Sequence, residues 1–212
     1  MTNFPARILL SLRASLCVSL VTATLLAGGS SAQTAMPGMH HGAAPGAAAA
    51  GTSSQGAELS GLRKLRGRAF DRAFLSMMIP HHQMAADMAR AALPVSRDAT
   101  VKAWATAVIR DQTAEIKQMN SLLGTFGGAD RAMAAAMSAS MSGMAGAVKT
   151  AGNPDVAFVQ GMLPHHASAV DMANLALQQG QDARVLKLAR DIVTAQAGEM
   201  YSYRTWLRAR GL

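Results

Sequence analysis

Met77-Met78-Ile79-Pro80-His81-His82 occurs twice in this chain of 212 residues, the second time as Gly161-Met162-Leu163-Pro164-His165-His166. A shift of 84 positions, without a gap, aligns the two copies together with their surroundings. It places Phe74 on Phe158, Asp87-Met88-Ala89 on Asp171-Met172-Ala173, Gln112 on Gln196 and Glu115 on Glu199. A self-similarity of this period indicates one supersecondary unit that is present twice.

The apolar residues of each copy recur with the spacing of a helix. In the first copy they lie three or four positions apart, as in the seam of a packed helix: Phe74, Met78, His81, Ala85, Met88 and Ala92. Aromatic residues make up only 4% of the chain, and alanine, leucine and methionine favour helix over sheet. We expect helices at about 68–93, 98–124, 154–179 and 182–209. Because one hairpin could not bury its apolar face alone, the two should close an all-α four-helix bundle with a pseudo-two-fold axis.

The first 32 residues indicate a secretory signal peptide. Arg7 and Arg13 precede a short apolar segment, and Ser30-Ser31-Ala32 offers the small residues that a signal peptidase needs. The apolar segment is short for a membrane span, so we expect a periplasmic or secreted protein without stable membrane insertion after cleavage. An uncleaved N-terminal anchor is the alternative. The only cysteine, Cys17, would leave with the signal, so no thiol would remain as a ligand.

Residues 33–57 are rich in Ala, Gly, Pro and Ser and predict a flexible N-terminus ahead of a duplicated twin-histidine domain at 58–212. Within six positions this segment holds four soft or borderline metal ligands: Met36, Met39, His40 and His41. They could wrap a copper or silver ion. The alternative is a low-complexity tail whose ligands are incidental.

Polar residues interrupt the apolar seams at equivalent positions of the two repeats. Burying an unpaired carboxylate costs several kcal/mol, so such a layer needs a reason, either a hydrogen-bonded network or a metal site. The nearby methionines and the lack of thiols favour Cu(I), Cu(II) or Ag(I). We expect the ligands to be His81, His165, Glu115 and Glu199, followed by His82, His166, Met78, Met88, Met162 and Met172.

The second histidine of each pair lies about 100° round the helix from the first, so His82 and His166 should flank the seam. There they would complete the site, support it by hydrogen bonds or line a water-facing entry. Pro80 and Pro164 should either kink their helices or begin new ones. Both options place the histidines at an irregularity of the backbone.

The segment that joins the two repeats, residues 129–152, carries four methionines at helical spacing: Met133, Met137, Met141 and Met144. In one continuous helix they would form a single stripe. Such a stripe predicts either an amphipathic connecting helix packed on the bundle or an auxiliary thioether site for Cu(I) or Ag(I). Its serines and glycines make the segment a poor helix.

The repeated Met-x-Pro-His-His motif, with Asp-Met-Ala after it and Gln-x-x-Glu on the next helix, resembles a bacterial secreted family catalogued as domain of unknown function 305. The resemblance covers roughly residues 68–209. It implies a ferritin-like four-helix architecture, with His81, His82, His165 and His166 as motif residues. Some members are linked to periplasmic copper binding and copper resistance, so it also supports copper. Di-iron bundles use Glu-x-x-His where this chain has Gln-x-x-Glu, which makes iron a weaker expectation.

These features predict an exported, non-enzymatic protein that buffers or delivers copper, or silver. Its partners would be metal ions and copper-export or delivery proteins, and its oligomeric state is open. Despite a formal charge of +8, the chain lacks a basic run with interleaved aromatic residues, so we expect no nucleic acid binding. One alternative is a ferritin-like metal-dependent oxidase. Another is a structural secreted bundle whose polar layer fixes the helix register without metal.

Overall fold

The computed structural model describes residues 59–212, and the predictions for residues 1–32 and 33–57, including Met36, Met39, His40 and His41, lie outside this part. The main helices are α2 (Gly67–Ala92), α3 (Ala99–Thr125), α4 (Arg131–Ser140), α5 (Met144–Thr150), α6 (Pro154–Gln179) and α7 (Ala183–Arg208). None of the helices in residues 59–212 combines the length and apolar character that crossing a membrane requires.

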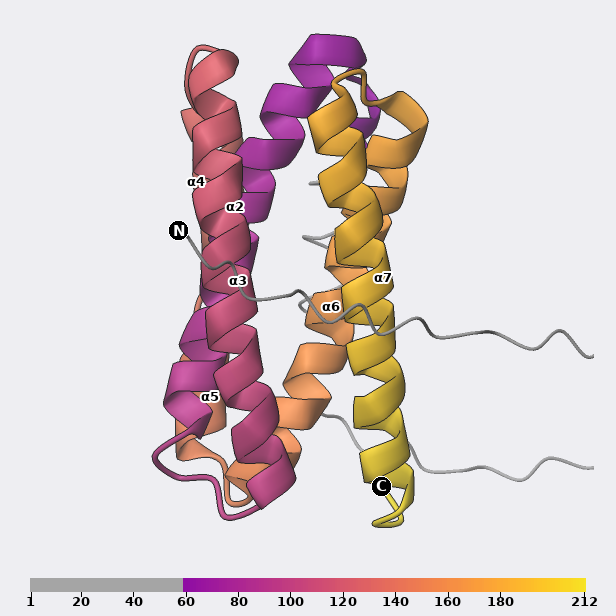
Figure 1. The fold of residues 1–212 in the computed structure, drawn as a ribbon. Helices are drawn as coiled ribbons and strands as arrows, with labels where there is room; N and C mark the ends of the chain where they lie inside the picture. Colours follow the sequence, from indigo (N-terminus) through magenta and orange to yellow (C-terminus); the bar gives the residue numbers. More distant parts are fainter. Residues whose placement is uncertain (1–58) are drawn as a thin grey trace, which may run out of the picture. The chain divides into compact units, whose positions relative to one another are not determined.

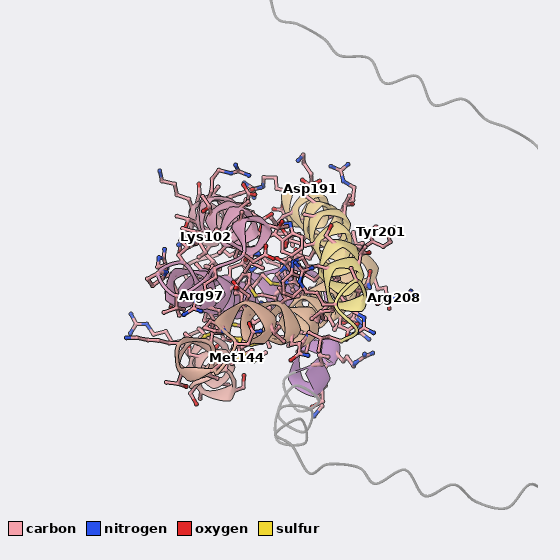
Figure 2. The ribbon with its side chains drawn as sticks, turned by 90° about the horizontal axis from the view of Figure 1, so that it is seen from below. Arg97, Lys102, Met144, Asp191, Tyr201 and Arg208 are labelled. Carbon is pink, nitrogen blue, oxygen red and sulfur yellow. The ribbon has the colours of Figure 1, made fainter. Side chains whose placement is uncertain are left out.

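The four long helices form the predicted bundle of two repeated hairpins (Figure 1). Helix α2 pairs with α3, α6 pairs with α7, and α2 packs against α6 to join the hairpins. The predicted boundaries of these helices agree with the observed ones to within one residue at each end. Viewed from below, charged side chains such as Lys102, Asp191 and Arg208 extend outward (Figure 2). Residues 59–212 form helices and no strands, so the predicted all-α fold class is confirmed.

A repeat-related pair of carboxylates ties each hairpin to the other. The buried Asp71 of α2 accepts hydrogen bonds from the backbone N–H groups of Gln181 (3.1 Å) and Asp182 (2.9 Å), just before α7. Asp155 of α6, 84 positions later, accepts equivalent bonds from the two backbone N–H groups just before α3. The first helix of each repeat thus holds the turn of the other repeat.

The connector between the hairpins consists of two short helices. Both α4 and α5 pack against α2, and α5 also contacts α6. Helix α4 ends at Ser140 with Met141 as its C-cap, and Gly143, with φ at +87°, precedes α5. The segment is not one continuous helix, so the single methionine stripe does not form: α4 ends before Met141, and the left-handed backbone at Gly143 separates Met144 from the other three methionines.

Two buried apolar clusters fill the bundle, and a polar layer separates them. On α2 one cluster ends at Met78 and the other begins at Ala85, and on α6 they are divided between Met162 and Ala169. Pro80 and Pro164 lie inside α2 and α6, and both helices continue through them. The alternative in which new helices begin at the prolines is therefore wrong.

Candidate metal centre

The gap between the two clusters contains four buried histidines, which we call the histidine layer: His81, His82, His165 and His166. At its centre the imidazole rings of His81 of α2 and His165 of α6 lie against each other, with ring centroids 3.9 Å apart and ring planes tilted by 38°. Burial lowers the pKa of both imidazoles well below the usual value of 6.5, and neighbouring imidazoles lower each pKa further. Each ring lies near the other residue's backbone carbonyl, which opposes the shift without reversing it. Both histidines are therefore neutral at pH 7.

The second histidine of each pair contacts the glutamate of its own hairpin. His82 Nε2 lies 2.7 Å from Glu115 Oε2, and His166 Nε2 lies 2.5 Å from Glu199 Oε2. Glu115 and Glu199 thus contact the second histidines, His82 and His166, and not the seam histidines His81 and His165 together with which they were expected to bind an ion. Helix α2 packs against α3 on one side and α6 on another, so a 100° step turns one imidazole toward each neighbour.

Of the three roles open to His82 and His166, the structure shows hydrogen bonding and excludes a water-facing entry, because both residues are 0% exposed. The side chains of Glu115 and Glu199 are 23% and 28% exposed, so the carboxylates form the rim of the layer rather than its core. Each glutamate uses one oxygen to hold a buried imidazole. This arrangement resembles the carboxylate–histidine pairs that orient metal-binding histidines in proteins.

The hydrogen bonds fix which ring nitrogen carries the lone pair in three of the four histidines: His81, His82 and His166. Ser168 Oγ donates its proton to the carbonyl oxygen of His165 (2.9 Å), so it can only accept from His81 Nε2 (2.7 Å). His81 therefore has its lone pair at Nδ1. His82 and His166 donate from Nε2 to carboxylates, which in the neutral ring leaves Nδ1 as the acceptor.

These lone pairs have no hydrogen-bond partner within residues 59–212. The unpartnered buried ring nitrogens are Nδ1 of His81, His82 and His166 and both nitrogens of His165, one of which carries a lone pair in the neutral ring. Each unsatisfied buried group costs about 1–3 kcal/mol, which a purely structural layer would avoid. Neutral imidazole lone pairs are ligands for copper, so these residues fit a metal better than a self-contained hydrogen-bond network.

A break in the repeat explains why His165 differs from His81. The residue that serves His81 is Ser168, and its counterpart 84 positions earlier is Met84, which has no hydroxyl group. His165 is therefore left without the hydrogen bond that orients its partner. The two halves of the layer are related in sequence but are not equivalent in chemistry.

The predicted methionines flank the layer on both sides. Met78 and Met172 belong to one apolar cluster, and Met88 and Met162 belong to the other, so each repeat contributes one methionine to each side. All four are buried. At Gly161, a Cβ atom would come within 2.9 Å of the Met88 methyl group, so glycine there makes room for that side chain.

One buried residue beside the layer gave no signal in the sequence. Tyr203 of α7 has its ring centroid 5.6 Å from that of His166, and its hydroxyl has no partner among the described residues. Burial, and the charge of Glu199, raise the pKa of this phenol. Its repeat counterpart is Met119, so the internal comparison offered no reason to single it out.

Carboxylates contribute little to the centre of the site. Across residues 59–212, no three side chains of the His, Cys, Asp or Glu type are grouped so that they could hold a metal ion. A site in this layer would therefore complete its ligand set with thioethers, which are soft ligands and suit Cu(I) and Ag(I).

Comparison with known proteins gives a consistent family match. The sequence model of the family described as Domain of unknown function (DUF305) matches residues 21–123 and 155–212, which leaves out α4 and α5. A curated relative, the uncharacterized protein L153 of Acanthamoeba polyphaga mimivirus, is 41% identical over 61 residues. Those residues are 28% of this chain, and the chain spans 40% of the length of that relative.

Solved structures of similar proteins include CopM in its Cu(I)-bound form, with 32% identity over 66% of this chain and 96% of that chain, and a TM-score of 0.56. CopM in an Ag-bound form shows 34% identity over 66% and 95% of the two chains, with the same TM-score. A DUF305 protein from Streptomyces coelicolor shares the fold, at 22% identity over 66% and 93%, with a TM-score of 0.59.

Proposed function

The chain belongs to the DUF305 family, and from that premise we propose that it binds copper or silver ions in the histidine layer and buffers or delivers them after export. The observation that carries this proposal is the set of buried imidazole lone pairs without hydrogen-bond partners among the described residues. Solved structures of CopM, about one third identical over 66% of this chain, hold Cu(I), Cu(II) and Ag, which supports the same ions here.

The roles of the residues follow from their contacts. His81 and His165 supply the central imidazoles, and His82 and His166 supply imidazoles that Glu115 and Glu199 hold in position. In this proposal the glutamates orient ligands instead of binding the ion directly. The flanking thioethers come from Met78, Met88, Met162 and Met172.

Binding and release of an ion suit this layer better than oxidation of one. The two carboxylates lie at the rim, and each already accepts a hydrogen bond from a histidine, whereas ferritin-like oxidases use several carboxylates as direct ligands. We propose that the chain acts in the periplasm or outside the cell, on the basis of the predicted signal at residues 1–32. We propose that a separate binding segment contains Met36, Met39, His40 and His41.

A competition titration distinguishes copper binding in the histidine layer from copper binding by the segment that contains Met36, Met39, His40 and His41. The purified protein is titrated with Cu(I) against a chromophoric chelator, beside a variant in which all four histidines of the layer are changed to Asn. A matched control carries Met36→Ser, Met39→Ser, His40→Asn and His41→Asn. We expect the layer variant to lose the tightest equivalent and the control to retain it. Equal affinity of the layer variant and the unmodified protein, with both helical by circular dichroism, would contradict the proposal.

A further inference from the structure

The connector helix α4 closes a small pocket at one side of the histidine layer. The cavity is about 10 Å³, roughly the room that one water-sized sphere needs. Side chains from α2, α4 and α6 and from the stretch before α2 line it: Leu59, His81, Met137, Ser140, Met141, Ser168 and Met172. Three thioethers and one imidazole therefore meet around one enclosed space.

The ligand chemistry of this pocket is soft. Thioether sulfur and neutral imidazole nitrogen select Cu(I) and Ag(I), and none of the lining residues is a carboxylate that would favour a hard ion. His81 is one of the residues with a buried, unpartnered ring nitrogen. Met137, Met141 and Met172 are each less than 5% exposed, so water competes poorly for an ion held among them.

Specific contacts hold α4 over the pocket. The backbone N–H of Asp130 donates to Ser76 Oγ on α2 (2.8 Å), and the Asp130 carboxylate caps α4 by accepting from the Met133 N–H (3.1 Å). Arg72 of α2 donates to the carbonyl oxygens of residues 128 and 129 in the preceding turn (2.8 and 2.9 Å). The placement of Met137 and Met141 is thus anchored at the start of their helix.

The connector is also the part of the described chain that the family match leaves out, since the match stops at residue 123 and resumes at 155. The second side of the layer lacks an equivalent, because its pocket contains Met88 and Met144 but no histidine. We propose that Met137 of α4 and its C-cap residue Met141, with Met172 of α6, supply the thioethers that complete the coordination of the Cu(I) or Ag(I) ion bound by His81, a ligand set particular to this connector. This inference deepens the proposed function and rests on it.

Methyl NMR of the full chain tests the site directly. Ag(I) is diamagnetic, so methionine methyl groups labelled with ¹³C report sulfur coordination without loss of signal. On addition of Ag(I), we expect the resonances of Met137, Met141 and Met172 to shift together, with Met119 and Met133 unchanged. The variant Met137→Leu/Met141→Leu should lose one equivalent of bound Ag(I), or bind it at least tenfold more weakly.

The matched control is Met119→Leu/Met133→Leu. Met119 belongs to the same apolar cluster as Met137 and Met141, and Met133 of α4 packs against that cluster. Neither Met119 nor Met133 lines the pocket. Both pairs of changes nearly conserve volume, so both variants should fold. Unchanged number and affinity of bound Ag(I) in the Met137/Met141 variant, or an equal loss in the control, would overturn the inference. If the Asn variant of the layer still loses its tightest ion in that case, the proposed function stands without this site.

Discussion

Adjacent histidines on one helix differ in direction by about 100°, and in this protein that step separates two jobs. His81 and His165 face each other between α2 and α6, while His82 and His166 turn toward glutamates on α3 and α7. A helix that is covered on one side only would expose one imidazole of each pair. Because α2 is packed against several helices, both of its histidines are buried.

Acid should destabilise the metal-free protein through the central pair. Burial lowers the pKa of His81 and His165 below 6.5, so in acid the unfolded chain binds up to two protons that the folded chain does not. Above pH 6.5 these two histidines leave the free energy of unfolding independent of pH. Below pH 6.5 that free energy falls, until the pH reaches the pKa values of the two histidines in the folded protein. The free energy of unfolding should then drop by up to about 1.4 kcal/mol per pH unit for each histidine.

Urea denaturation between pH 7.5 and pH 5.5 measures this dependence. The matched control is His81→Asn/His165→Asn, which keeps polar side chains in the layer but cannot take up these protons. We expect its stability to vary less with pH than that of the unmodified protein. Identical pH dependence in the two proteins would show that the central pair is not held neutral.

At the scale of helices, the sequence predicted the features that depend on neighbouring residues along the chain. Helical spacing predicted the long helices closely, because it depends on residues within a few positions of each other. The roles within the layer depend on which helices are neighbours, so the spacing alone left three roles open for His82 and did not show that Glu115 would contact it. The hydrogen bonds of Asp71 cross more than 100 positions and gave no local pattern. The serines and glycines of residues 129–152 predicted a poor helix, but they did not show at which residue the helix would end.

The contact of Asp71 with the turn before α7 predicts that two aspartates of α2, Asp71 and Asp87, contribute unequally to the free energy of unfolding. Asp71→Ala removes the acceptor of two backbone N–H groups next to α7, so we expect it to lower the free energy of unfolding by about 2–4 kcal/mol. The control Asp87→Ala changes an aspartate on the same helix whose side chain is 42% exposed, and should stay within about 0.5 kcal/mol. Urea denaturation at pH 7 gives both values. Similar stability of the two variants would mean that Asp71 does not join the hairpins.

For the whole bundle, duplication gives a nearly symmetric frame around a site that is not symmetric. Met78 and Met162 are related by the repeat, as are Met88 and Met172, and each apolar cluster contains one methionine of each pair. The histidine layer lies between the clusters. The internal repeat made this frame predictable from the sequence. The asymmetry has two sources: Ser168, whose counterpart in the first repeat has no hydroxyl group, and the connector, which is present once. Only the folded chain brings both of them next to the imidazole of His81.

Anomalous diffraction at the copper absorption edge, from crystals of the protein loaded with Cu(I), tests the central claim most directly. The peak locates the ion independently of any assumption about its ligands. We predict a peak between α2 and α6, within bonding distance of imidazole nitrogens of the histidine layer. Copper found only on the outer surface of the bundle, with no peak in the layer, would contradict the account.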